Sequence, residues 1–542
     1  MQGRKNFNPK MMYQVHLDDL VPQDNFYRRI SDYVDFNFLY KLTAKYYGTE
    51  GQESIDPVVF FKVCIVGYLN NITSDRRLID YCSNCLDIRL FLKYDIDEKL
   101  PWHSTISRTR QLFGEDIFLI LFRQILTKCI DVGLVRGKRQ AFDSVFIKAN
   151  ASMDSIIEKE ILDDAKLYAQ ELDQNSEFKI QTTGLCPKDK AVPYVTPDKM
   201  KQVNKHHDWK KEEYKGMPGH NDSVRTDENG NLIRPRYLSN HTHFSAVDPD
   251  ARISTKPGKP RQLNYFAQIA VDDANHIITG ACADFADKRD SECLEHIADL
   301  TKENLELNGM FLDQILADTG YSSGEALYYC DQNNIDAFIP NFGQYKNERP
   351  GFIYNQSLNQ YECLQENRAI LLFKGTKTDS KGYSKNTYRS SETDCKNCPL
   401  RQQCCGKSTK FKKIDDSIHK DLYDRMHDKM NTIYAKRLSK IRSKTVEPVL
   451  GHLINFLGMK HIQARGIRAA IKHVLMASLC HNLKRLMKTI IKKPEITAQY
   501  ANISLNNAKN WLYFYFFSLR HSISLYIIES NKISPFSVIL KN

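Results

Sequence analysis

Two aspartates lie in or at the end of predicted strands, where their carboxylates could support metal chemistry. Asp143 lies in "AFDSVFIKANAS", residues 141–152, among aromatic and β-branched residues typical of a buried strand. Asp318 closes the apolar run "FLDQILAD" and is followed by Gly320 and Ser322, which indicates a sharp turn at the C-terminal end of a strand. A helix cap or a turn residue would explain either aspartate alone. If the two strands are neighbours, however, the carboxylates would repel each other unless a cation lies between them.

A third acid, Glu447, lies next to an apolar helix face. It precedes Pro448, a residue that is accepted in a first helical turn and disfavours helix for the residue before it. We therefore expect Glu447 to begin or kink a helix. The side chains expected to face a core from this helix are Val449, Leu450, Leu453 and Phe456.

A group of cysteines indicates a second kind of site. Cys395 and Cys398 form a C-x2-C pair, Cys404 or Cys405 follows closely, and Cys363 could add a fourth thiolate. Four thiolates, assigned to Cys363, Cys395, Cys398 and Cys404, would bind a structural Zn²⁺ and hold together a polar segment that lacks a core of its own. Simple reduced cysteines are the alternative.

The elements that position these residues begin with helical patterning over residues 17–135. Within it, "TSDRRLIDYC" and "HSTISRTRQLFG" each open with a Ser or Thr suited to a helix N-cap, and the second carries Arg108 and Arg110. Two short helices with an exposed basic edge fit a helix-turn-helix that lays a helix on DNA. A helical bundle with surface arginines would give the same pattern.

The middle of the chain is typical of a mixed sheet flanked by helices, which places the fold in the α/β class. After the first aspartate's strand, residues 152–235 read as a polar, Lys-rich insertion. Two β-rich runs then flank "DDAN", which predicts an antiparallel hairpin with Asp272 and Asp273 in its turn. A helix is expected to begin at Asp290 or Ser291, before the second aspartate's strand.

Composition favours a reduced, cytosolic protein with a polyanionic partner. Lys and Arg outnumber Asp and Glu by 77 to 65 among 542 residues, although solvated basic faces give the same balance. We expect no signal peptide, and the most apolar stretch, residues 511–519, is too short to span a membrane. Fourteen cysteines without a secretory context indicate reduced thiols. Cys82 and Cys85, a second C-x2-C pair in an apparent helix, are interpreted as core or surface residues.

Five motifs in register carry a family resemblance over roughly residues 15–487. The chain resembles the DDE transposases of bacterial insertion sequences in the IS1182 group, within the wider IS4-like class. The motifs are "AFDSVFIKANAS", "NYFAQIAVDD", "LADTGYSSGEAL", "TVEPVLGHLINFLGMKHIQARGI" and "HVLMASLCHNLKRL". The N-terminal "IDPVVFFKVCIVGYL", "SDRRLIDYC" and "HSTISRTRQLFG" resemble the helical domain that precedes the catalytic core in those enzymes.

The resemblance implies an RNase H-like core in which Asp143, Asp318 and Glu447 are catalytic and bind two Mg²⁺ or Mn²⁺ ions. Such hard cations prefer carboxylate oxygens. Many relatives carry a Lys one helical stretch after the Glu, but the aligned residue here is Ile454. DNA contact must therefore come from other cations, for which the candidates are Arg108, Arg110, Arg442, Lys444, Lys460 and Arg465.

Residues and resemblance together predict five segments. These are a helical N-terminal DNA-binding domain (1–139), the first part of an RNase H-like catalytic core with its insertion (140–345), a cysteine-bearing insertion (346–418), the helical final part of the core (419–490) and a tail of unknown role (491–542).

The resemblance predicts a transposase that binds the ends of its insertion sequence and catalyses divalent-metal-dependent DNA strand cleavage and transfer. Its partners would be double-stranded DNA, as element ends and target, and a second copy of the chain in a homodimer at synapsis, with no membrane. It would act in the cytoplasm, at the nucleoid. The alternatives are a catalytically inactive DNA-binding regulator derived from a transposase and a general metal-dependent nuclease.

Overall fold

The computed structural model divides the chain into two compact units, Met1–Asn482 and Leu483–Asn542. It describes residues 15–48, 50, 54–158, 160–161, 194–195, 225–226, 232–233, 240, 243–254, 261–343, 345, 347–365, 369–378, 383–396, 398–405 and 409–492. Most of the predicted insertion at 152–235 and nearly all of the predicted tail at 491–542 therefore lie outside the described residues.

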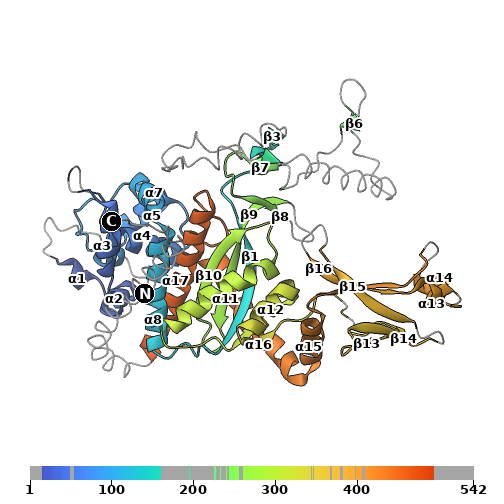
Figure 1. Ribbon diagram of the computed structural model, residues 1–542. Helices are drawn as coiled ribbons and strands as arrows, with labels where there is room; N and C mark the ends of the chain where they lie inside the picture. The colour runs from blue at the N-terminus through green and yellow to red at the C-terminus, as the bar shows by residue number, and fades with distance from the viewer. Residues whose placement is uncertain are drawn as a thin grey trace, which may run out of the picture. The chain divides into compact units, whose positions relative to one another are not determined.

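The N-terminal region is helical, as predicted, and is drawn in blue in Figure 1. Its best-buried helix, α4, follows Asp56, whose side chain accepts hydrogen bonds from the N–H groups of Val58 and Val59. Pro57 occupies the first helical position, where a missing N–H costs nothing. The helices are α1 (Leu17–Leu20), α2 (Phe26–Tyr33), α3 (Phe38–Thr43), the 3-10 helix η1 (Ala44–Tyr46), α4 (Pro57–Leu69), α5 (Asp75–Asn84), α6 (Leu86–Leu92), α7 (His103–Leu112) and α8 (Glu115–Asp131).

The two helices predicted to form a helix-turn-helix are present, but they are not consecutive. α5 begins after Ser74, whose hydroxyl accepts from the Arg77 N–H, as a cap should. α6 then separates α5 from α7, whereas a helix-turn-helix connects its helices by a turn of about three or four residues. α7 begins after Trp102, which gives no side-chain cap, so the predicted Ser or Thr cap of that helix is wrong. α5 and α7 nevertheless pack against each other.

A mixed sheet of six strands forms the centre of the fold, which confirms the predicted α/β class (Figure 1). Its order is β10-β9-β1-β11-β12, and β8 also pairs with β9. The partners of β9 are antiparallel, while β1, β11 and β12 run parallel. The strands are β1 (Arg139–Lys148), β8 (Arg252–Ser254), β9 (Gln262–Asp272), β10 (Ile278–Phe285), β11 (Gln314–Leu316) and β12 (Asp336–Phe338).

The hairpin of β9 and β10 is present, but the interpretation of Asp272 as a turn residue is wrong. Asp272 is the last residue of β9 and is fully buried. Its carboxylate accepts hydrogen bonds from the N–H groups of Arg136, Gly137 and Ala274 and from the Gln140 amide, at 2.9–3.2 Å. Asp272 thus ties the loop before β1 to the hairpin, because it supplies acceptors to donors that the sheet leaves unpaired.

Helices cover the sheet. α11 (Asp290–Glu306) packs against β10 and starts where the sequence places it, with the Glu292 side chain accepting from the Arg289 N–H. A short 3-10 turn, η5 (Thr319–Tyr321), and α12 (Gly324–Gln332) connect β11 to β12. α15 (Lys420–Asn431) and α16 (Ile433–Phe456) follow later in the chain, and α16 packs against β1.

α16 differs from its prediction at both ends. It runs unbroken through Glu447, with Pro448 inside the helix, so Glu447 does not begin it. Val449, Leu450 and Leu453 are buried as predicted, because they share the face that meets the sheet. Phe456, the last residue of the helix, is 61% exposed and does not face a core.

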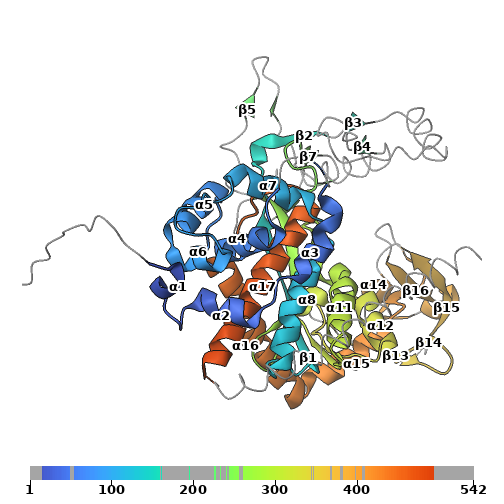
Figure 2. The same cartoon turned by 90° about the vertical axis from the view of Figure 1, so that its left-hand side faces the viewer.

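The first part of α17 (Ile467–Lys492) joins the helical region to the sheet. The Tyr68 hydroxyl of α4 meets the His473 ring at 2.6 Å, and the Asn482 side chain bonds both backbone polar groups of Ile278 in β10. Figure 2 shows α17 beside α4 and α8. The N-terminal helices are therefore part of the same compact unit as the sheet.

A second, antiparallel sheet holds the cysteine-bearing segment. Its order is β13-β14-β15-β16-β17, and two five-residue helices, α13 and α14, lie between the last two strands. Its buried core is small and consists of Tyr361, Leu371, Tyr388 and Ile414, with Phe352 packed against them. The elements are β13 (Phe352–Asn355), β14 (Gln360–Cys363), β15 (Ile370–Thr378), β16 (Ser384–Ser390), α13 (Glu392–Lys396), α14 (Arg401–Cys405) and β17 (Lys413–Ser417).

Candidate active site

Asp143 and Asp318 lie side by side because β1 and β11 are parallel neighbours. The pairing register aligns Ala141 with Leu316, and each aspartate lies two residues further along its chain. Residues two apart on a strand face the same side of a sheet. β11 ends at Leu316, so Asp318 stands just beyond the C-terminal edge of that strand. The structure therefore brings together two acids that are far apart in the sequence.

Asp143 is mostly buried, with its side chain 16% exposed. One carboxylate oxygen accepts from the Ser144 N–H at 2.8 Å, and the other lies 3.1 Å from the Arg442 guanidinium. Burial raises the pKa of Asp143, an effect that the Ser144 N–H and Arg442 oppose and the negative charge of Asp318 reinforces. A cation at this carboxylate is therefore favoured.

Asp318 both caps a turn and faces the site. Its Oδ1 accepts from the Gly320 N–H at 2.9 Å, as a turn residue's would. A Cβ built on Gly320 would lie only 3.0 Å from this oxygen and 2.6 Å from Oδ2 of Asp290. Glycine thus leaves open a small space in which two carboxylates meet.

Asp290 is a third carboxylate of this cluster, and the sequence indicates it only as a possible helix start. It is the first residue of α11, and its Oδ1 accepts a hydrogen bond from the Ser144 hydroxyl, next to Asp143 in β1. Burial raises the pKa of Asp290, and the negative charges of Asp318 and Asp143 raise it further, while the Ser144 hydrogen bond opposes the rise. An acid at the start of the helix that follows the hairpin is the one signal that could have identified it.

Glu447 reaches the cluster through Arg442, one helical turn earlier on α16. The two terminal nitrogens of the Arg442 guanidinium lie 3.1 Å from Asp143 Oδ2 and 3.8 Å from Glu447 Oε1. Glu447 itself is 60% exposed. The guanidinium therefore bridges two of the three acids predicted to be catalytic.

The donor set fits a hard divalent cation. The carboxylates of Asp143, Asp318 and Asp290 lie close enough to repel one another, and the Arg442 guanidinium is hydrogen-bonded to Asp143. Mg²⁺ retains several water ligands, so it needs few protein carboxylates. Within the described ranges, however, no three His, Cys, Asp or Glu side chains are already gathered in the geometry of a metal site. Binding would require the side chains to rotate inward.

The six cations predicted to contact DNA fall into two groups. Arg108, Lys444, Lys460 and Arg465 are exposed. Arg442 is engaged with the acids, and Arg110 donates to both carboxylate oxygens of Asp75 in α5, at 2.9 and 2.7 Å. Ile454 occupies the position at which many relatives carry a Lys, and it is half-buried on α16.

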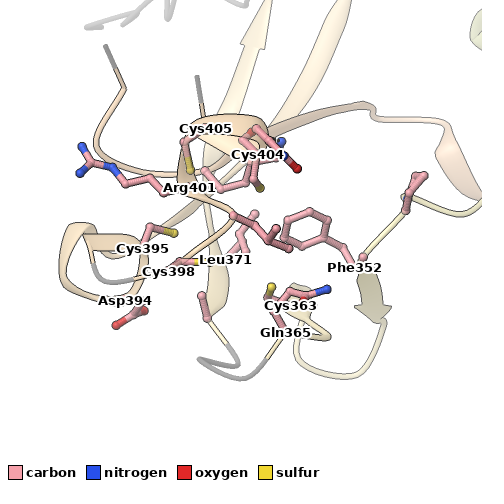
Figure 3. A pocket seen from close by; sticks show the side chains of 16 residues that line it. Phe352, Cys363, Gln365, Leu371, Asp394, Cys395, Cys398, Arg401, Cys404 and Cys405 are labelled. Atoms are coloured by element: carbon pink, nitrogen blue, oxygen red, sulfur yellow. Dashed lines mark hydrogen bonds between the residues drawn. The ribbon is translucent and has the colours of Figure 1, made fainter. Parts of the chain in front are cut away.

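Five thiols lie around one pocket of about 320 Å³ on the second sheet (Figure 3). They are Cys363, Cys395, Cys398, Cys404 and Cys405. Every cysteine that the structure describes is a free thiol. Cys82 is buried in α5 and Cys85 lies at the junction of α5 and α6.

Two family models match the chain. Residues 15–112 match a transposase domain (DUF772). Residues 362–487 match a transposase DDE domain, which includes Glu447 and all five thiols of the pocket. No curated protein matches the chain.

Two separate segments of the chain are thus similar to transposase domains. Transposases act on DNA, and those with a DDE domain generally use divalent metal ions. More narrowly, the two matches are consistent with a DDE transposase of insertion sequences of the IS1182 group. Among the described helices, none combines the length and apolar character that a membrane span requires.

Proposed function

We propose that this chain is a transposase that binds the ends of its insertion sequence and catalyses divalent-metal-dependent DNA strand cleavage and transfer. Asp143, Asp318 and Glu447 are its catalytic acids. The observation that carries this proposal is that Asp143 on β1 lies beside Asp318, which directly follows the parallel neighbour β11. Asp143 is mostly buried, its pKa is raised chiefly by that burial and further by the negative charge of Asp318, and a cation between the two acids would relieve this cost.

Two Mg²⁺ or Mn²⁺ ions, when bound, would activate the attacking oxygen and stabilise the leaving oxygen of a phosphodiester. Asp143 and Asp318 would hold them from the sheet, and Glu447 from α16. Arg442 would release Asp143 in that state, because the ions supply the positive charge that its guanidinium supplies otherwise. Its released guanidinium would then be available to a DNA phosphate.

The central sheet is proposed to be an RNase H-like core. Three antiparallel strands, β10, β9 and β1, continue into the parallel β11 and β12, and α11 makes the crossover to β11. In this topology Asp143 lies on β1, Asp318 follows the neighbouring strand β11, and Glu447 comes from the later helix α16.

DNA would be held by the exposed cations. Arg108 lies on α7, Lys444 on α16 near Glu447, and Lys460 and Arg465 follow α16. The Lys148 N–H donates to the Lys460 carbonyl, so this segment is attached to the end of β1. Joining two element ends in concert would use a homodimer, acting at the nucleoid.

The test is cleavage of a duplex carrying the element's ends, measured beside binding of the same duplex. Asp318→Asn should abolish Mg²⁺-dependent cleavage while end binding persists, because an amide offers a metal a neutral oxygen instead of an anionic one. Asp143→Ala and Glu447→Ala should do the same. Asp313→Asn, an exposed acid just before β11, is the matched control and should cleave normally.

Three outcomes would contradict the proposal in different ways. Full cleavage by Glu447→Ala would remove that residue from the site. End binding without any cleavage by the parent chain would favour an inactive regulator. Cleavage that is indifferent to the end sequence would favour a general nuclease.

A further inference from the structure

We infer that the pocket on the second sheet is a structural Zn²⁺ site formed by the thiolates of Cys363, Cys395, Cys398 and one member of the vicinal pair Cys404–Cys405. This site is separate from the acids of the proposed active site. It rests on the convergence of three chain segments on one pocket, on the weak packing of the helices there and on the cations beside it.

The thiols come from three segments that approach one another only in the folded chain. Cys363 is the last residue of β14, Cys395 lies in α13, and Cys404 and Cys405 end α14. Figure 3 shows Cys363 across the pocket from the other four side chains. The Cys398 N–H donates to the Cys395 carbonyl at 3.4 Å, which folds the C-x2-C pair into a turn. Such a turn would let both sulfur atoms bind one ion. Among the described residues no three thiols are yet gathered in the geometry of a metal site, so binding would draw the three segments closer together.

Packing alone gives the two helices little support. α13 and α14 have five residues each, far fewer than the roughly twelve at which an isolated helix becomes even marginally stable. Cys395 is the single buried residue of α13, and α14 has none. A bound metal would supply the cross-link that such a small, polar segment needs.

The surroundings suit a charged thiolate cluster. Four thiolates around Zn²⁺ leave a net negative charge, and Arg401 and Lys412 both line the pocket. The Lys412 ammonium is anchored there by the Cys404 carbonyl at 2.7 Å. The Cys395 and Cys404 side chains both lie close to the Cys405 thiol.

The first measurement is the metal content of the full chain, purified without chelator and analysed by plasma mass spectrometry. We expect about one Zn²⁺ per chain. Co²⁺ exchanged into the site should give the intense visible bands of tetrahedral thiolate coordination. The pocket thiols should resist maleimide until a chelator is added, which tests the site without any substitution.

Substitutions then identify the ligands. Cys363→Ser, Cys395→Ser and Cys398→Ser should each lose the zinc, whereas Cys85→Ser, a half-buried thiol of the helical region, should retain it. The double variant Cys404→Ser, Cys405→Ser should also lose the zinc.

The inference would be overturned if the parent chain contained no zinc, or if its pocket thiols reacted equally with maleimide before and after a chelator is added. A disulfide within the pocket would overturn it as well. Asp318→Asn should keep its full zinc content, so the failure of the proposed catalytic site and the failure of the zinc site are distinguishable.

Discussion

Asp290 offers the sharpest test of the carboxylate cluster, because substitution by Asn removes the negative charge of this side chain while its size and shape stay nearly the same. In Asp290→Asn the amide oxygen can still accept the hydrogen bond from the Ser144 hydroxyl. The negative charge that faces Asp318 across the space at Gly320 disappears. We therefore predict that Asp290→Asn stabilises the metal-free fold and weakens its response to divalent ions.

The size of the effect follows from the geometry. Carboxylate oxygens of Asp290 and Asp318 lie 2.6 and 3.0 Å from one point, the Cβ position of Gly320. The two oxygens are therefore less than about 6 Å apart, and two unit charges at about that separation repel by about 3 kcal/mol at an effective dielectric constant of about 20. Solvent and salt reach this edge of the sheet, so we expect about 1 kcal/mol of added stability at neutral pH. Because the pKa of Asp290 is raised in the fold, this gain should vanish as the pH falls through that raised value towards the ordinary 3.8, where the parent carboxyl is protonated too.

The assay is urea unfolding with and without Mg²⁺. The parent chain should gain about 2.7 kcal/mol at an ion concentration of about a hundred times the dissociation constant, and Asp290→Asn should gain clearly less. Glu295→Gln, an exposed acid on the same helix, should behave like the parent. The placement of Asp290 in the cluster would be refuted by two results together. These are an Asp290→Asn variant that is no more stable than the parent without metal, and an unchanged gain in stability on adding Mg²⁺.

Two further predictions concern residues whose interpretation the structure changes. Asp272→Ala should lower the free energy of unfolding by about 3 kcal/mol, because it leaves four hydrogen-bond donors at a buried site without their acceptor. Urea unfolding of this variant beside Asp273→Ala tests the prediction. Equal unfolding midpoints for the two variants would contradict it. Arg108→Ala should weaken end-DNA binding and reduce its salt dependence without changing stability, whereas Arg110→Ala should lower stability by about 1 kcal/mol, because it removes the partner of Asp75. Fluorescence anisotropy across a salt series, read beside urea unfolding, separates the two arginines, and identical behaviour would contradict their assignment.

Much of the fold could be predicted from local pattern. The strand around Asp143, the hairpin of β9 and β10 and the start of α11 follow from β-branched runs, turn residues and capping positions, which act over a few neighbouring residues. The pattern failed where tertiary packing opposes a local preference. Pro448 disfavours helix for the residue before it, yet α16 continues through it because the face that carries Val449 and Leu453 is buried against the sheet.

The sequence by itself determined which residues could do chemistry, because acids in apolar strands and closely spaced thiols stand out as residue types that are costly to bury. Asp272 shows that hydrogen bonds can offset this cost as a metal would, so residue type alone did not separate a structural acid from a catalytic one. The sequence could not determine which of these residues meet. That Asp143 lies beside Asp318 depends on the pairing of β1 with β11, and Asp290 joins them only because α11 brings its first residue to Ser144. The roles of Arg442 and Arg110 are likewise set by Asp143 and Asp75, partners remote in the chain. The type of each residue can be read from the sequence. Which charged groups interact depends on the distance between them in space, and only the tertiary structure sets that distance.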